Sequence, residues 1–318
     1  MSRAGRRHLV AAAGAALGVV LFVWAVERVG VDALLEAVRR VGWGLVAIVA
    51  IAGARFALRA QCWRWCLLPG VSLDFRHAFV AFLAGDAVGN VTPLGMLASE
   101  PTKVLLTRHH LATLDSIASL ALENILYTIS VMAMLAFGLG LMLVTVPLSD
   151  GIRWTTLGAL AVIGSVAIGA IAVLRAPVGA PGQGPSRWRS RAVRLRTELS
   201  RFAVEHPARM ARVLALQLGF HVLAVLETFL TLEWLMGART PTLTQSVLFE
   251  TVNRLTVVLF KFVPFRIGID EATSGAAATL FAVTAAAGVA LAVVRKARQL
   301  FWTAIGLLLI ATHPAERG

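Results

Sequence analysis

Two short polar stretches in an otherwise apolar chain carry the residue types that could do chemistry. Each begins at a proline and reaches a glutamate seven residues later, in 93–100 and in 264–271. A glycine lies between the two, and the residue before each glutamate, Ser99 or Asp270, is of a type that caps helix N-termini. A carboxylate at the start of a buried helix is favoured by the helix dipole. Such a group could pair with a cation, accept a proton or contact a polar head group.

Basic side chains near the two stretches add the capacity to bind a lipid phosphate. The candidate substrate- or lipid-binding residues are Asn90, Pro93, Gly95, Ser99, Glu100, Lys103, Arg254, Lys261, Pro264, Arg266, Gly268, Asp270 and Glu271. A structural alternative stays open, in which Glu100 and Glu271 only cap their helices and pair with these bases. Glu123, Glu227 and His221 are weaker candidates, because a role inside a helix bundle explains them equally well.

The elements that must position these residues are membrane-spanning helices. Of the 318 residues 58% are hydrophobic and only 15% are charged, and the apolar residues form runs of about 20, the length that crosses a bilayer core. We expect an all-α integral membrane protein, a polytopic helical bundle of about seven spans. The predicted spans are 9–26, 43–65, 116–146, 154–174, 213–236, 272–294 and 300–311, and a short interfacial helix is predicted at 31–41.

Two further apolar segments, 78–97 and 243–267, contain proline, glycine and charged residues. These residues interrupt helices and are costly in lipid, so the segments predict broken or re-entrant helices buried against protein. They contain or precede the two proline-to-glutamate stretches, which indicates a local internal repeat. Charge counting places the first break on the cytoplasmic side and the second on the outer side, which would make the repeat inverted.

Charge sets the expected topology. The net charge is +13, and residues 175–212 hold nine arginines against two glutamates. We expect this linker to be cytoplasmic and its 187–201 part to form a basic helix on an anionic lipid surface. The N-terminus is also predicted to be cytoplasmic. Arg55 and Arg59 are expected to snorkel to the interface, and the basic residues of 295–298 to mark a cytoplasmic turn.

The sequence predicts one membrane domain over residues 1–318, with a first half at 9–174 and a second half at 213–311 on either side of the 175–212 linker. We expect no metal, because Cys62 and Cys66 cannot coordinate zinc alone. No nucleotide-binding loop is present in the sequence, and no cofactor, catalytic residue or nucleic-acid partner is expected.

The stretch from Asn90 to Lys103 resembles the first motif of the flippase-like membrane domain of lysylphosphatidylglycerol synthases. Residues 264–271, 288–295 and 302–306 are similar to the closing part of that domain, and the likeness extends over about 10–311. The second motif departs from the pattern, with Phe265, Arg266 and Ile267 where more glycine is expected. The resemblance implies a multi-pass protein of a bacterial or archaeal inner membrane that handles polar lipids. It does not imply synthase activity, which in the two-part synthases belongs to a separate soluble domain.

Three functions follow from these observations. The first is a lipid flippase or transporter that moves a polar lipid, anionic or glycosylated, between leaflets. The second is a membrane-embedded enzyme acting on lipid head groups, for which the His109–His110 pair beside Glu100 is the nearest feature. The third is a non-catalytic scaffold that binds other proteins of a lipid pathway. The first explains the broken helices and is preferred, with a membrane lipid as the substrate.

Overall fold

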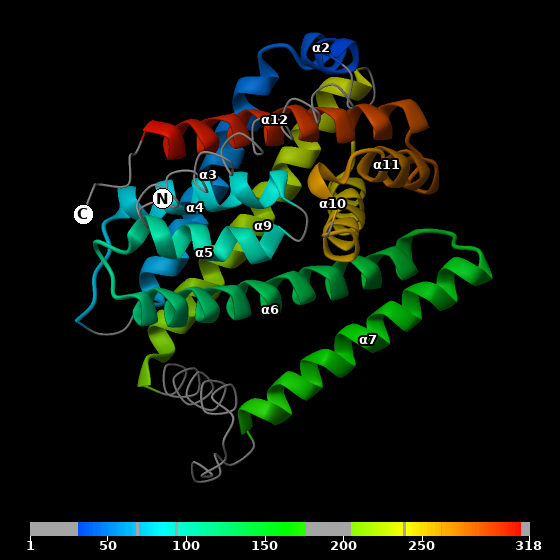
Figure 1. The fold of residues 1–318 in the computed structure, drawn as a ribbon. Helices are drawn as coiled ribbons and strands as arrows, with labels where there is room; N and C mark the ends of the chain where they lie inside the picture. The colour runs from blue at the N-terminus through cyan, green and yellow to red at the C-terminus, as the bar shows by residue number, and fades with distance from the viewer. Residues whose placement is uncertain are drawn as a thin grey trace.

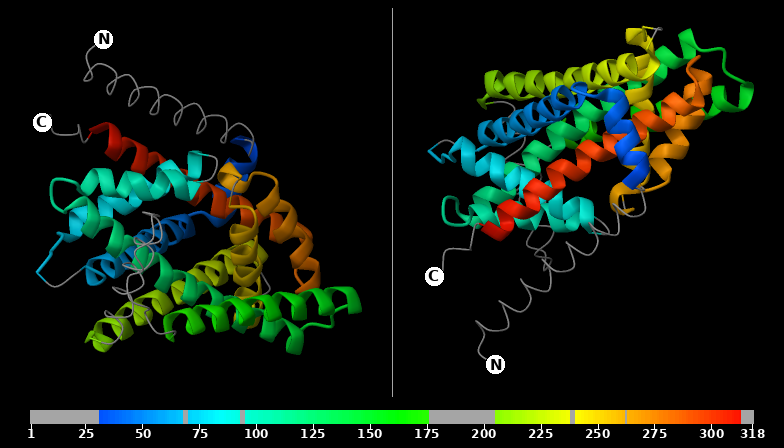
Figure 2. Two further views of the ribbon diagram at one scale, coloured as in Figure 1. Left: turned by 60° about the horizontal axis from the view of Figure 1, so that its bottom comes forward. Right: turned by 90° about the horizontal axis from the view of Figure 1, so that it is seen from above.

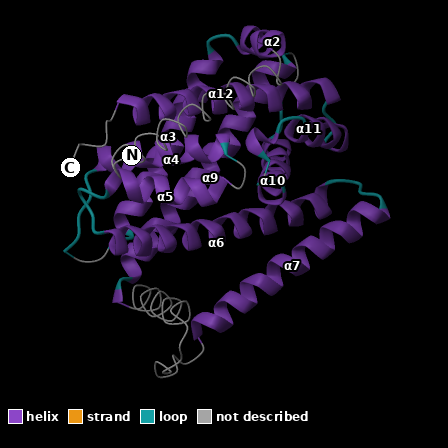
Figure 3. Cartoon of the chain, viewed as in Figure 1, coloured by secondary structure: helices purple, strands orange, loops and turns teal. Residues whose placement is uncertain are grey.

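The computed structural model describes residues 31–67, 70–92, 95–175, 205–237, 240–261 and 263–312. Within these ranges the chain forms helices joined by turns, without strands (Figure 3). The prediction of an all-α fold is therefore confirmed. The predicted first span at 9–26, the predicted surface helix at 187–201 and the candidate residue Pro93 lie outside the described residues.

The helices follow the chain in one bundle (Figure 1). They are α2 (Val31–Val41), α3 (Gly44–Trp65), α4 (Phe75–Val91), α5 (Gly95–Thr107), α6 (Thr113–Thr145), α7 (Asp150–Arg175), α9 (Pro207–Met236), α10 (Leu243–Leu259), the 3-10 helix η1 (Pro264–Arg266), α11 (Ile269–Leu280) and α12 (Ala285–Thr312).

Four helices are long and apolar enough to cross a membrane, namely α3, α6, the Asp150–Gly169 part of α7, and α9. They coincide with the predicted second to fifth spans. Gly44, at the start of α3, faces Trp234 near the end of α9, and Cys62 lies 3.7 Å from the carbonyl of Val213. These contacts make α3 and α9 antiparallel neighbours. The end of α3 and the start of α9, both predicted to be cytoplasmic, therefore lie side by side.

The first break separates α4 from α5, which fold back on each other as a hairpin. Thr92 ends α4 in extended backbone, as expected before a proline. A Cβ on Gly95 would lie only 2.2 Å from the carbonyl oxygen of Gly89, so glycine is required where the two backbones meet. The break at the predicted place is confirmed. The helix begins earlier than expected, however, because Ser99 and Glu100 lie inside α5 and Ser99 is no N-cap.

We expect Gly95→Ala to destabilise this hairpin by about 1–3 kcal/mol, because backbone cannot move aside as a side chain can. Gly164→Ala in α7 is the matched control. Its Cβ would meet nothing within 4 Å, and alanine favours a helix over glycine by up to about 1 kcal/mol. Thermal unfolding in detergent, followed by labelling of the buried thiols Cys62 and Cys66, measures both. Equal melting temperatures for the two variants would contradict the close contact.

The second break runs from Phe260, after α10, to Gly268, before α11. Gly268 has a φ of +79°, and Phe265 and Arg266 have φ values of +50° and +47°. Non-glycine residues in the left-handed region store strain that the surrounding structure must offset. The break predicted in this segment is confirmed. Here too the N-cap differs, since Gly268 caps α11 and Asp270 lies in its first turn.

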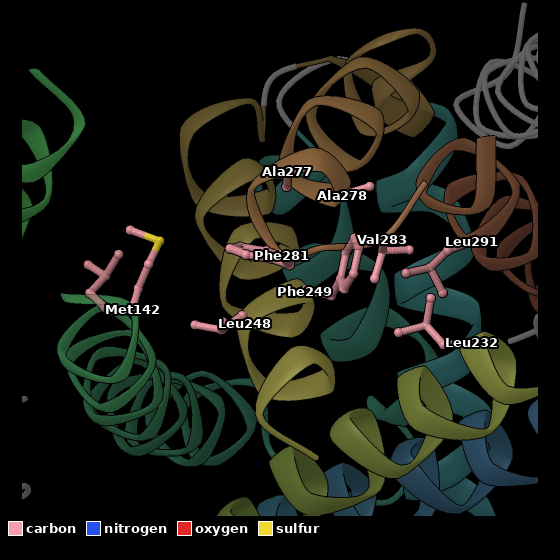
Figure 4. Close-up of a cluster of buried hydrophobic side chains, with 10 residues drawn as sticks. Met142, Leu232, Leu248, Phe249, Ala277, Ala278, Phe281, Val283 and Leu291 are labelled. Carbon is pink, nitrogen blue, oxygen red and sulfur yellow. The ribbon is translucent and has the colours of Figure 1, made fainter. Parts of the chain in front are cut away.

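The last part of the chain corrects two predicted spans. The predicted span 272–294 is divided at 281–284, where Ala282 has a φ of +56°, and α11 and α12 pack against each other. Phe281 turns into the core against Phe249, at 5.3 Å between ring centroids (Figure 4). Burial of this ring and of Val283 favours the turn. The helix α12 then runs across the bundle without interruption through the residues expected to form a cytoplasmic turn (Figure 2).

Candidate functional site

The two breaks lie against each other. Val91 at the end of α4, Phe265 of η1 and Leu300 of α12 form one buried apolar cluster. The contacts of α12 come from Lys296, Gln299, Leu300 and Thr303, which the helical repeat places on one face. One face of α12 therefore holds both broken helices, although the breaks are far apart in the sequence.

Asn90 ties the first break to α12. Its amide nitrogen donates to Asp86 at 2.9 Å and to Thr303 at 3.1 Å, and its carbonyl oxygen accepts from Gln299 at 2.9 Å. The positive charges of Lys103, Arg59 and Arg298 favour the ionised form of the Asp86 carboxylate. The side chain of Asn90 thus connects the end of α4 with two turns of α12.

Lys296 ties the second break to the same helix. Its ammonium donates to the Phe265 carbonyl and, at 2.7 Å, to Asp270, which also accepts from Arg266 at 3.1 Å. Lys296 is 1% exposed, so it is a buried structural cation. This finding corrects the predicted cytoplasmic turn. Arg295 and Arg298 are also paired side chains of α12.

Glu100 and Glu271 share an unusual feature. Lys103 donates to one oxygen of Glu100 at 2.7 Å, while the other, Oε2, is buried and has no hydrogen-bond partner in the part of the chain that the structure describes. The same holds for Oε2 of Glu271. A buried acceptor without a donor costs free energy, so each glutamate retains the capacity to bind a proton, a cation or a ligand donor. These two glutamates occupy equivalent positions in the two proline-to-glutamate stretches of the sequence.

Lys261 connects the second break electrostatically with the first. The negative charge of Glu100 favours the charged form of the Lys261 side chain, whereas the positive charges of Arg59 and Lys103 disfavour it. Lys103 also lies 4.1 Å from the ring centroid of Phe82. The predicted candidates Glu100, Lys103 and Lys261 therefore lie within one local electrostatic environment.

A network of buried charges stands beside the breaks, and the sequence did not predict its pairings. Arg59 makes two bonds of 2.7 Å to Glu123, and Gln217 donates to the same carboxylate at 3.0 Å. The guanidinium of Arg59 also lies 3.8 Å from the ring centroid of Tyr127. Arg59 is thus a buried partner inside the bundle rather than a snorkelling side chain.

Two more glutamates each form salt bridges with two arginines. Glu227 accepts from Arg55 at 2.8 Å and from Arg298 at 2.6 Å. Glu250 accepts from Arg254 at 2.8 Å and from Arg295 at 3.1 Å.

Among the described residues, the ion pairs of this network join five arginines to three glutamates, so these eight side chains carry two more positive than negative charges. Nη2 of Arg254 and Nε of Arg55 are buried donors that no described residue pairs by a hydrogen bond. The network can therefore attract an anionic group.

The structure places the other candidates as follows. Pro264 and Gly268 form part of the second break, and Arg254 belongs to the charge network. His221 shares a hydrogen bond of 3.0 Å with Ser130. Three or more metal-ligating side chains do not cluster anywhere in the described ranges. Sequence reasoning missed Gln299, Lys296 and the arginine pairings; the one available signal was charged residues within apolar helices.

Comparison with known proteins gives one result for the whole chain. A family model described as the lysylphosphatidylglycerol synthase TM region matches residues 11–306. The chain matches no curated protein and no solved structure. The match covers both breaks, the charge network and most of α12.

Proposed function

The chain belongs to the lysylphosphatidylglycerol synthase TM region family, and on this premise we propose that it moves a polar lipid between the leaflets of a membrane. The family makes it a membrane protein of lipid metabolism or transport. The finer proposal of transport depends on the two broken helices that meet at α12.

Broken helices at membrane depth favour a transport site. Irregular backbone is tolerated there only when protein buries it or when it lines a cavity. Pairs of discontinuous helices form the substrate sites of many transporters, and rocking of one repeat against the other exposes the site alternately. We propose that the α4–α5 and α10–α11 pairs are such repeats, inverted with respect to each other.

The residues at the breaks supply suitable chemistry. The unpartnered oxygens of Glu100 and Glu271 can accept hydrogen bonds from a polar head group or a proton, and the arginine surplus can hold an anionic or phosphate part of the same lipid. The proposal needs no catalytic residue. The driving force is a proton gradient or the lipid gradient itself.

The antiparallel ends of α3 and α9 support the proposed orientation. Arg64, Arg209 and Arg212 gather at one end, and Arg209 and Arg212 belong to the arginine-rich 175–212 linker. The positive-inside rule assigns this end to the cytoplasm of an inner membrane and, through the predicted first span, the N-terminus to the same side.

The test is lipid movement in proteoliposomes carrying a panel of labelled anionic, glycosylated and zwitterionic lipids. We expect the wild-type protein to move at least one of them. Glu100→Gln/Glu271→Gln should slow that movement at least about tenfold, because one lost charge-assisted bond in the transition state has this effect.

The matched control is Glu36→Gln/Glu233→Gln, which makes the same chemical change on α2 and α9, away from the breaks. It should move lipid at the wild-type rate. Undiminished movement by the Glu100/Glu271 variant would exclude these glutamates as the site. Wild-type protein that moves no lipid of the panel would count against transport altogether.

A further inference from the structure

A second basic region lies away from the breaks, where α3 ends and α9 begins. It is a hollow of about 250 Å³. The described residues that line it are Arg64, Trp65, Leu67, Gly70, Val71, Arg209 and Arg212. Three arginines thus line one small volume, and no acidic side chain is among the described lining residues. An anion bound there would offset the repulsion between these like charges.

Arg64 is fixed in place before any ligand binds. Its Nε donates to the Leu73 carbonyl at 2.8 Å, and its Nη1 donates to Gln61 at 2.8 Å. The same guanidinium lies 6.0 Å from the ring centroid of Phe75. These contacts orient the planar group, which lowers the entropy cost of binding a ligand. No hydrogen bond joins Nη2 to another described residue.

Arg209 and Arg212 differ from Arg64 because both are exposed and three residues apart on the first turns of α9. That spacing puts them on one side of the helix. The described part of the chain contains no salt bridge to either of them. They are therefore available to bind an anion together with the oriented side chain of Arg64.

The position of the hollow indicates where the anion comes from. It lies at the ends of two helices that are long and apolar enough to cross a membrane, and Trp65 lines it. Tryptophan and arginine at the end of a span are typical of the head-group layer. Guanidinium groups bind phosphate oxygens through paired hydrogen bonds.

We propose that this hollow binds the phosphate group of an anionic phospholipid, which links the end of α3 to the start of α9. The inference does not depend on the proposed transport. The bound lipid would be a fixed structural ligand, separate from the lipid that the breaks would handle. A bridging anion there offsets the repulsion between the arginines and stabilises the contact between the two helices.

The test compares purified protein in detergent with added phosphatidylglycerol, phosphatidylcholine or inorganic phosphate. Native mass spectrometry counts retained lipid, and thiol labelling of Cys62 and Cys66, buried in the core near this end, follows thermal unfolding. We expect phosphatidylglycerol to be retained and to raise the melting temperature, and phosphatidylcholine to do neither.

The variant is Arg209→Gln/Arg212→Gln, because both side chains are exposed and the fold should tolerate their loss. We expect phosphatidylglycerol to bind it at least about tenfold more weakly. The control, Arg39→Gln/Arg153→Gln, removes two exposed arginines elsewhere and should bind as the wild-type protein does.

Retention of phosphatidylglycerol by the Arg209/Arg212 variant with unchanged affinity would overturn the assignment. An equal loss in the Arg39/Arg153 control would also overturn it, since only total charge would then matter. If inorganic phosphate alone reproduces the whole stabilisation, the phosphate site stands, but a free anion replaces the lipid as its ligand.

Discussion

Glu227→Gln is expected to lower the free energy of unfolding by about 3–5 kcal/mol, because it leaves two arginines buried without their carboxylate. Arg55 and Arg298 both donate to Glu227, whose side chain is only 4% exposed. They approach from α3 and α12, so the carboxylate joins three helices of the bundle. Reversible unfolding in mixed micelles measures the change.

Glu233→Gln is the matched control on the same helix, because Glu233 forms no salt bridge with the described residues. Its effect should stay within about 0.5 kcal/mol. The triple variant Arg55→Leu/Glu227→Leu/Arg298→Leu should recover much of the stability, since apolar residues often replace a buried ion network without loss. Equal costs for Glu227→Gln and Glu233→Gln would show that the three charges do not depend on each other.

Lys296→Met is expected to loosen the second break from α12 and to lower the free energy of unfolding by about 3 kcal/mol. The substitution removes one of the two cationic partners of Asp270 and leaves the Phe265 carbonyl without its donor. Asp270 keeps Arg266, so the cost lies at the low end for a broken buried pair. The strained backbone at Phe265 and Arg266 would lose the contact that holds it, and lipid movement should fall together with stability.

Arg40→Met provides the comparison, because Arg40 also pairs with a carboxylate but both partners are more than half exposed. Its cost should be below about 1 kcal/mol. A double-mutant cycle with Asp270→Asn isolates the pair: Lys296→Met/Asp270→Asn should cost less than the sum of its single changes. Additive costs would mean that Lys296 acts only through its packing.

Much of the fold could be predicted from local sequence. Long apolar runs predict helices that cross a membrane, and α3, α6, α7 and α9 begin and end within a few residues of the expected places, apart from a longer N-terminal extension of α7 and α9. The breaks were predictable for the same reason, since proline, glycine and charge interrupt a helix wherever it lies. Local spacing also indicated that Glu100 and Glu271 occupy equivalent positions after the two breaks. Each has one oxygen that no described residue pairs by a hydrogen bond.

Whether a charged residue lies in an exposed turn or is paired inside the bundle could not be predicted from its local sequence. The basic residues at 295–298 have the composition of a cytoplasmic turn, yet they lie within α12 and are paired with Glu250, Asp270 and Glu227. Burying a cation is costly unless a carboxylate meets it. Whether a helix can continue through such residues therefore depends on partners that are distant in the sequence.

The sequence by itself determined the class of protein, the positions of its breaks and the two glutamates that the breaks share, because hydrophobicity and backbone restrictions act over a few residues. Only the tertiary structure decided that one face of α12 holds both breaks and that Arg55 and Arg59 are paired inside the bundle. These outcomes depend on contacts between helices far apart in the chain, where electrostatic pairing must offset the cost of removing each charge from water.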